Sequence, residues 1–317
     1  MKQKAMTPRQ RLQAVLEGRI PDRVPHFELV FQLEKEATGK TWPSPEALLK
    51  ASAKEKEYWI QEYLDLWETI IDRYGWSAVP LPVHVSGLEQ GQVIQAGRKR
   101  FGDKVLIFDF NGEGTFWMPS GSEIMAFTVM LFEEPEKAHE LARRKRDQSM
   151  RLARLQVDQG VDFIVINSDY GFNQGPFISP AMFAEFVTPY LAEIVDKMHQ
   201  FGTRAILHSD GDLRKILDQL VSTGLDGYQS VDPQGNMDIA QVKQQYGDRL
   251  ILMGNVQASL LQDEDETRIR ESVRYCMTHA KPGGRYIFST SNCIFAGMPL
   301  HNYNVMLDEF EKLAAYD

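Results

Sequence analysis

The sequence predicts an α/β protein that folds as a (β/α)8 barrel, and two observations lead to this prediction. Apolar strands, each followed by an amphipathic helix, recur through the second half of the chain. Buried strands that alternate with helices are typical of a parallel sheet covered by helices. The chain has 317 residues, and its successive strands begin roughly 25 to 45 residues apart, a spacing that suits such a barrel.

The elements of this half of the chain are bounded by clear start and stop signals. The strands are expected at 162–170, 204–210, 227–231, 250–256 and 285–291. The helices are expected at 136–159, 180–200, 212–223, 237–247, 266–280 and 301–317. Ser179 and Pro180 provide a capping hydroxyl and a proline in the first turn, whereas Pro282 and two glycines end the helix at 266–280.

An open, doubly wound parallel sheet is the alternative architecture. It is disfavoured because no G-x-G-x-x-G motif follows any of the expected strands. The chain also contains no solenoid repeat, no low-complexity segment and no linker. We therefore expect residues 1–317 to form a single barrel domain.

The first part of the chain is expected to differ from a regular series of βα units. Thr7 and Pro8 begin an N-terminal helical segment that ends at Gly18. A strand is expected at 23–32, and helical material continues from Pro45 to about Asp65. Residues 77–131 are rich in Val, Phe and Gly and contain paired turn residues, a composition that predicts an insertion of antiparallel β-hairpins.

The composition restricts the functional classes. Acidic residues outnumber basic ones, and the net charge of −9 argues against a nucleic acid or an anionic membrane as partner. Two cysteines fit a reducing compartment rather than a disulfide scaffold. The chain has no apolar run long enough for a signal peptide or a membrane span. We therefore expect a cytoplasmic protein.

Polar residues follow the apolar part of each expected strand, at the end where active sites lie in barrels of this kind. These residues are Asn167 to Tyr170, His208 to Asp212, Ser230 with Asp232, Asn255 with Gln257, and Ser289 to Cys293. Loops are also polar because they meet water, so the pattern has a simpler explanation. We interpret the repetition of the pattern at five strands as a candidate site.

His208 is the most informative of these residues, because it follows a buried strand and precedes a carboxylate by two positions. Alternation places His208 and Asp210 on one face of the strand, about 6.5–7 Å apart at Cα. Cys293, at the end of the last strand, would supply a thiolate to the same point. A His/Asp/Cys set suits zinc with one position open for catalysis. The alternative is a buried histidine bonded to Asp210 and a cysteine that only fills space.

Several stretches of the chain resemble the uroporphyrinogen decarboxylase-like superfamily, which implies a (β/α)8 barrel. These stretches are TPRQRLQAVLEGRIPDRVP (7–25), residues 162–202 that begin DFIVINSDYGF, residues 206–257 that begin ILHSDGD, and residues 283–307 that begin GGRYIFSTSNC. The similarity covers almost the whole chain and is weakest at 40–130.

The decarboxylases of that superfamily carry an N-terminal arginine-rich motif that holds the carboxylates of the substrate. This chain has PHFELVFQLEKEATGK in the corresponding place, which offers Glu28, Glu34 and Glu36 instead of cations. Decarboxylation of uroporphyrinogen is therefore not expected. Glu28 lies on the expected strand 23–32 and is a candidate for binding substrate at the mouth of the barrel.

The chain is more similar to the corrinoid-dependent methyltransferases of the superfamily, in particular to O-demethylase components. The zinc-binding members use H-x-C on one strand and a cysteine on the last strand. His208 matches the histidine, Asp210 stands where the first cysteine would be, and Cys293 matches the second. The resemblance implies a zinc ion held by His208, Asp210 and Cys293.

The resemblance also implies a reaction. A methyl group would move from a small methylated donor, of which a methoxylated aromatic is one candidate, to the Co(I) of a corrinoid. The chain lacks a D-x-H-x-x-G motif, so the corrinoid would be bound by a separate carrier protein. His208 and a proton donor, Asp169 or Tyr170, would act in catalysis. The expected substrate-binding residues are Asn167, Asn255, Gln257 and Glu28.

Two other functions remain open at this point. One is a metal-free, decarboxylase-like lyase for a small carboxylic acid, which predicts a cluster of basic residues near the mouth of the barrel. The other is a non-catalytic accessory barrel, which the altered H-x-C motif favours.

Overall fold

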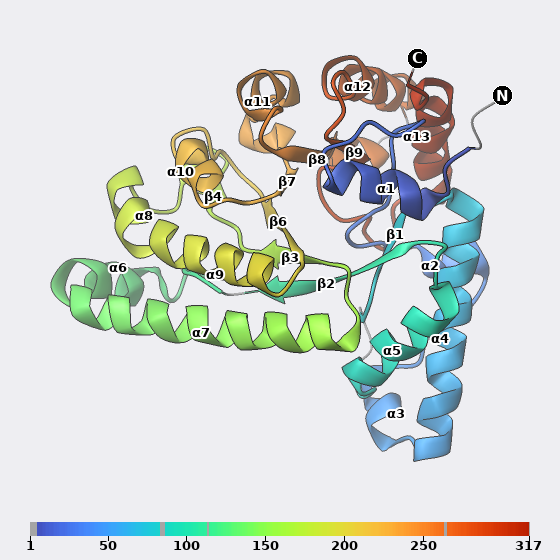
Figure 1. Ribbon diagram of the computed structural model, residues 1–317, viewed down its shortest axis with the longest axis horizontal. Coiled ribbons are helices and arrows are strands. Elements are labelled where there is room, and N and C mark those ends of the chain that lie inside the picture. The colour runs from blue at the N-terminus through green and yellow to red at the C-terminus, as the bar shows by residue number, and fades with distance from the viewer. Residues whose placement is uncertain (1–4, 83–85, 113, 263–264, 317) are drawn as a thin grey trace.

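The computed structural model describes residues 5–82, 86–112, 114–262 and 265–316, and its centre is a curled sheet of parallel strands (Figure 1). Along the sheet the order is β1-β2-β3-β6-β7-β8-β9, and every neighbouring pair is parallel. The strands are β1 Ala78–Pro80, β2 Leu106–Gly112, β3 Phe163–Asn167, β6 Arg204–Ser209, β7 Gly227–Ser230, β8 Ile251–Val256 and β9 Tyr286–Thr290. The architecture is therefore mixed α/β and similar to a TIM barrel, as predicted, but the described residues form a sheet of seven parallel strands where a (β/α)8 barrel has eight.

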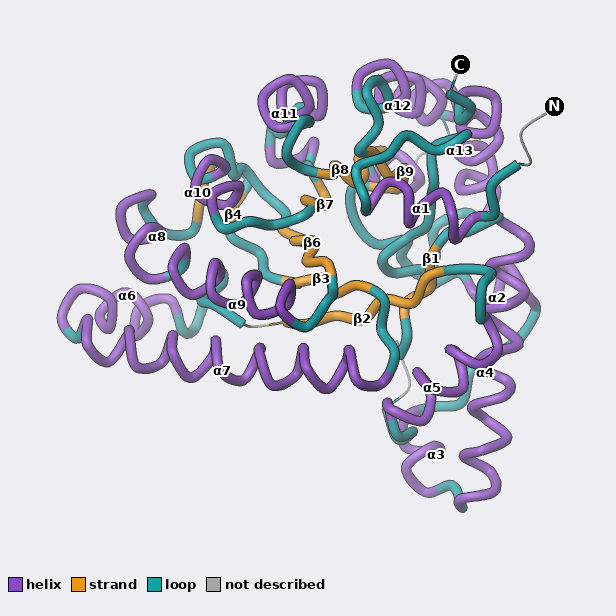
Figure 2. The backbone as a smooth tube through the Cα atoms, in the orientation of Figure 1, coloured by secondary structure: helices purple, strands orange, loops and turns teal. Residues whose placement is uncertain are grey.

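Helices surround the sheet on its outer side (Figure 2). They are α1 Pro8–Leu16, α2 Glu34–Thr38, α3 Pro45–Lys50, α4 Ala53–Tyr74, α5 Gln90–Phe101, α6 Ile124–Glu133, α7 Pro135–Gln159, α8 Pro180–Phe186, α9 Thr188–Gln200, α10 Leu217–Ser222, α11 Ile239–Tyr246, α12 Glu266–His279 and α13 Leu300–Leu313. Among the described residues, no helix combines the length and the apolar character that crossing a membrane would require.

The segment at residues 24–31 lies between the first and last strands of the sheet. Its His26 forms a parallel bridge to Phe288 of β9, and the carbonyl of His26 accepts a hydrogen bond of 2.9 Å from the Ser77 N–H, next to β1. The Phe288 N–H donates to the carbonyl of Pro25 at 3.0 Å. This segment was expected to be a strand over 23–32, but it makes only single bridges. Pro25 has no N–H to donate, so a continuous ladder cannot form there.

The prediction of a β-hairpin insertion at 77–131 is wrong for the described part of that range, which omits residues 83–85 and 113. Strands β1 and β2 pair in parallel, with Ala78 opposite Leu106, and α5 connects them. Val93, Ile94, Gly97 and Phe101 are the buried residues of α5, and their spacing is helical. The Val, Phe and Gly content suggested strands, but the positions of these residues along the chain suit two further βα units.

The loops that follow β3, β6 and β7 pack unusually close together. Gly211, after β6, has φ +85°, and a Cβ at this position would lie 2.2 Å from the carbonyl oxygen of Gly171. A Cβ on Gly235, after β7, would lie 2.3 Å from the carbonyl carbon of Gly211. Backbone therefore meets backbone at both contacts. These glycines allow the three loops to approach one another at the carboxyl end of the sheet.

The close contact at Gly211 predicts that alanine at this position lowers the free energy of unfolding. Gly202, which has a similar φ but no close neighbour, serves as the control. Gly202 has φ +84° and nothing within 4 Å of its Cβ position, so Gly202→Ala and Gly211→Ala create the same backbone strain. Only Gly211→Ala also pushes a methyl group into backbone, which costs about 1–3 kcal/mol more. Urea unfolding of both variants measures the difference, and equal losses of stability would contradict the close packing of the loops.

Candidate metal centre

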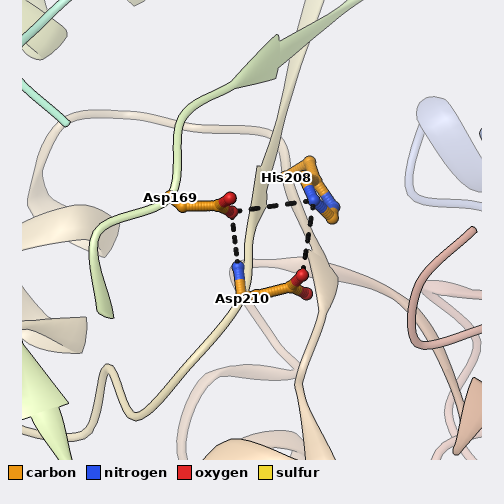
Figure 3. Close-up of side chains that lie close together, drawn as sticks. All are labelled: Asp169, His208 and Asp210. Atoms are coloured by element: carbon orange, nitrogen blue, oxygen red, sulfur yellow. Dashed lines mark hydrogen bonds and ion pairs between the residues drawn. The ribbon is translucent and has the colours of Figure 1, made fainter. Parts of the chain in front are cut away.

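Three side chains converge at the carboxyl ends of β3 and β6, and Figure 3 shows them pointing toward one another. They are Asp169, His208 and Asp210, and one ligand atom from each lies within 4.8 Å of the others. The His208 Nε2 is 3.8 Å from an Asp169 oxygen and 4.0 Å from an Asp210 oxygen. All three residues are half-buried. The sequence placed these residues at strand ends, and the parallel sheet brings them together.

Hydrogen bonds hold the two carboxylates in place. The Ser230 hydroxyl donates to Oδ1 of Asp210 at 2.6 Å, and the Asn292 amide donates to Oδ2 of the same residue. The backbone N–H of Asp210 donates to Oδ1 of Asp169 at 3.0 Å. Burial raises the pKa of Asp210, and the neighbouring His208 opposes this shift. Asp210 is therefore oriented by two side chains that are not candidate ligands, whereas Asp169 is oriented by the backbone of Asp210.

A cavity of about 850 Å³ opens beside these carboxylates. Asp169 and Asp210 line it, together with Asp232 and the β4–β5 hairpin, whose strands are Gly171–Phe172 and Gly175–Pro176. The other lining residues are Met118, Asn173, Gln174, Gly211, Gln234 and Asn292. Among the described residues that line the cavity, none is a lysine or an arginine. The volume is suitable for a small molecule, and the charge of the wall is negative.

Cys293, expected as the third metal ligand, is not part of the group. Within the described ranges, His208, Asp210 and Cys293 do not place three ligand atoms within 4.8 Å of one another, whereas Asp169 completes the set. Burial, followed by the charge of Asp210, raises the pKa of the Cys293 thiol to about 11. The geometry, and not this pKa, separates the cysteine from the set, because a bound metal ion lowers the pKa of a thiol that coordinates it. Asp169, expected as a proton donor, therefore takes the position that was assigned to the cysteine.

Tyr170, the other expected proton donor, is not among the described residues that line the cavity. Its side chain is fully buried, and its hydroxyl shares a hydrogen bond of 2.6 Å with the Thr115 hydroxyl. The ring packs edge-on against Phe183 with centroids 5.1 Å apart. Burial raises the pKa of Tyr170 to about 12. The structure thus places this phenol in the core beside β3.

The expected substrate-binding residues lie at separate places. Asn167 is exposed at the end of β3, opposite His208 in the register. Asn255 is buried, and its amide donates to the carbonyl of Val231 at 2.7 Å. Asn255 and Gln257 line a different cavity, of about 350 Å³. Only Asn167 is therefore a neighbour of the centre in the sheet.

Glu28, the remaining expected substrate-binding residue, is buried against β9. Its Oε2 accepts hydrogen bonds from the Thr290 hydroxyl at 2.7 Å and from the Thr290 N–H at 3.1 Å. Burial raises the pKa of Glu28 to about 8. Glu28 does not belong to the set of residues that line the large cavity. Its side chain is positioned to hold the end of β9.

One residue of the site was missed from the sequence. Gln229 lies within β7, and its amide oxygen contacts the Nδ1 of His208. The sequence feature that could have identified Gln229 is its amide side chain, which stands alone between the aromatic and small residues of the buried segment GYQSV. Ser230 and Asn292, which hold Asp210, were among the polar strand-end residues, but they had no assigned role.

Comparison with known proteins identifies the family. A profile described as uroporphyrinogen decarboxylase (URO-D) matches residues 117–313. The chain belongs to the uroporphyrinogen decarboxylase family. The resemblance noted in the sequence is therefore confirmed.

The curated relatives are decarboxylases at low identity. The uroporphyrinogen decarboxylase of Pseudoalteromonas atlantica is 26% identical over 237 residues, which cover 69% of this chain and 62% of the relative. That of Pectobacterium atrosepticum is 26% identical over 249 residues, which cover 74% of this chain and 68% of the relative. The similarity thus spans about two thirds of the length of each relative.

One solved structure is similar over nearly the whole chain. A methyltransferase from Methanosarcina mazei shares a TM-score of 0.73 at 18% identity, covering 97% of this chain and 99% of that one. At this level of identity, the comparison shows that the two chains share a fold.

The buried Glu28 predicts a pH dependence of stability. An unfolded glutamate ionises near pH 4.5, whereas Glu28 in the folded chain stays protonated up to about pH 8. Between these values the unfolded state binds fewer protons, so stability falls as pH rises. Each pKa unit corresponds to about 1.4 kcal/mol, and we expect a loss on the order of a few kcal/mol.

Glu28→Gln removes this titration while keeping an acceptor for Thr290. Urea unfolding at pH 5 and pH 8 should therefore show a smaller loss of stability in the variant than in the wild type. Parallel pH profiles for the two proteins would contradict a protonated Glu28.

Proposed function

We propose that this protein is a methyltransferase whose Asp169, His208 and Asp210 hold a divalent metal ion. The methyl group of a small methylated donor would pass to the Co(I) corrinoid of a separate carrier protein. The observation that carries this proposal is the convergence of two carboxylates and an imidazole beside a cavity at the carboxyl ends of parallel strands. The fold shared with the Methanosarcina mazei methyltransferase supports it.

The three residues fit a divalent cation. Zinc binds carboxylate oxygens and imidazole nitrogens at about 2.0–2.2 Å, so tetrahedral ligand atoms lie roughly 3.3–3.6 Å apart by that geometry. The present separations of 3.8 and 4.0 Å need only a small contraction. Two carboxylates and one imidazole also suit manganese, since no soft thiolate is in the set. Zinc is the metal we propose, with less selectivity than a cysteine-containing site would have.

The chemistry that such an ion supplies when bound is Lewis-acid stabilisation of a basic leaving group, for example the oxygen of a methyl ether. The residues of the chain do the rest. Ser230 and Asn292 keep Asp210 oriented. Phe172 and Met118 give the cavity wall an apolar part against which the donor, such as a methoxylated ring, would pack. The carrier protein would approach from the open side of this cavity.

Decarboxylation is the activity that the names of the curated relatives suggest, and one observation disfavours it for this chain. A substrate with several carboxylates needs fixed cations, but the described residues that line the cavity include no lysine or arginine and do include Asp169, Asp210 and Asp232. Carboxylates facing carboxylates repel each other. The described part of this wall also lacks the basic cluster expected of a lyase for small acids.

The ligand set can be tested by metal content. Wild-type protein, purified and loaded with zinc, should bind close to one ion per chain, and His208→Ala and Asp169→Asn should each weaken binding by roughly 100-fold or more because a ligand is lost. Cys293→Ser serves as the matched control, and it should bind zinc nearly as tightly as wild type. Mass spectrometry measures the metal content per chain, and competition with a chelator measures the zinc affinity. Loss of the metal in Cys293→Ser but not in Asp169→Asn would restore the His208, Asp210 and Cys293 set.

The charge of the cavity predicts which donors react. With cob(I)alamin as acceptor, a neutral methoxybenzyl alcohol should be demethylated with a kcat/KM at least about 10-fold above that of the matching methoxybenzoate, because about 1.4 kcal/mol of repulsion accounts for that ratio. Asp232→Asn removes one negative charge from the wall and should narrow the ratio. The loss of Co(I) absorbance follows the reaction. A preference for the benzoate would favour a decarboxylase-like substrate.

A further inference from the structure

The side chain of Gln229 is the contact that determines how His208 is presented. Gln229 lies on β7 directly opposite His208 on β6 in the parallel register. Its side chain is buried, with 1% of the residue exposed. A buried amide must satisfy both its N–H groups and its oxygen within the protein. The partners of this amide therefore restrict its orientation.

These partners leave one orientation. The Nε2 of Gln229 lies 3.2 Å from the carbonyl oxygen of Thr290 and 3.4 Å from that of Ser291. Backbone carbonyl oxygens can only accept hydrogen bonds, so the nitrogen of the amide must face them. The oxygen Oε1 is then the atom that contacts Nδ1 of His208. Thr290 is itself held by Glu28, which accepts from its N–H and its hydroxyl.

The orientation of the amide assigns the hydrogen on the imidazole. Because Oε1 accepts only, Nδ1 of His208 must be the donor and carries the hydrogen. In a neutral imidazole the lone pair then lies on Nε2. This atom faces the Asp169 and Asp210 oxygens at 3.8 and 4.0 Å. With His208 neutral and both acids ionised, three acceptor atoms therefore converge, and a cation between them would relieve their mutual repulsion.

We propose that Gln229 is a positioning residue that holds His208 in the Nδ1–H tautomer and so directs the lone pair of Nε2 into the metal centre. This inference rests on the proposed function, because that function supplies the metal. Gln229 is not one of the three candidate ligands and is not among the described residues that line the large cavity. It acts through His208, and Thr290 and Ser291 act through Gln229.

The test uses Gln229→Met, which keeps the length of the side chain and removes the acceptor. In the metal-free variant the Nε2–H tautomer should become dominant, since the two carboxylates then accept that hydrogen. The zinc affinity should fall by about 10- to 100-fold, as for other residues that orient a metal-binding histidine. Long-range ¹H–¹⁵N spectra of histidine-labelled protein at pH 8.5 identify the tautomer without any activity measurement.

Gln156→Met is the matched control. Gln156 is equally buried, and its amide donates to Asp109 and to the carbonyl of Phe110, away from the centre. This variant should keep the His208 tautomer and the zinc affinity of the wild type. Gln229→Glu keeps an acceptor for Nδ1 and should restore the Nδ1–H tautomer. Thermal unfolding of all variants shows whether each one folds.

The outcomes separate this inference from the proposed function. An Nε2–H tautomer in the metal-free wild type overturns the inference, and so does a Gln229→Met variant whose tautomer and zinc affinity match those of Gln156→Met. In either case, zinc binding by the wild type would leave the proposed function standing. If the wild type binds no divalent metal, the proposed function and the role of Gln229 toward a metal both fail, whatever the tautomer.

Discussion

In a parallel sheet the carboxyl ends of all strands meet at one edge, and in this protein the register of β3, β6 and β7 determines what meets there. Asn167, His208 and Gln229 stand side by side across the three strands. Asp169 and Asp210 follow two residues after Asn167 and His208, so the same register places both carboxylates next to the imidazole. A shift of one residue in either pairing would place one of the two paired side chains on the opposite face of the sheet from its partner.

The loops that follow these strands pack against one another at the same edge of the sheet. Gly211 and Gly171 let backbone touch backbone at the point where the loop after β6 meets the start of the β4–β5 hairpin, which follows β3. This close approach seats the backbone N–H of Asp210 against Asp169. The positions of the two acids therefore depend on how closely the loops pack.

Negative charge is the main electrostatic feature of the cavity beside the three candidate ligands. The described wall of the cavity carries carboxylates and amides but no basic side chain. Burial strengthens the interactions between these charges, so the pair of acids beside the His208 lone pair favours a bound cation. The same negative charge opposes acidic substrates. One arrangement of charge thus supports both parts of the proposed function, the metal and the neutral donor.

Local sequence by itself determined much of this protein. Local patterns correctly predicted the strands at 204–210 and 250–256 and the helix start at Ser179 and Pro180. They could do so because the periodicity of strands and helices depends on residues that are close together along the chain. The polar strand ends likewise predicted the edge of the sheet at which Asp169, His208 and Asp210 converge. Only the tertiary structure decided that Asp169 and not Cys293 joins His208 and Asp210, and that Asn255 faces another cavity. It also paired β1 with β2 in parallel and turned Gln229 toward His208. Each of these contacts joins residues that are far apart along the chain, and their distances depend on strand register and loop packing, which no local pattern encodes.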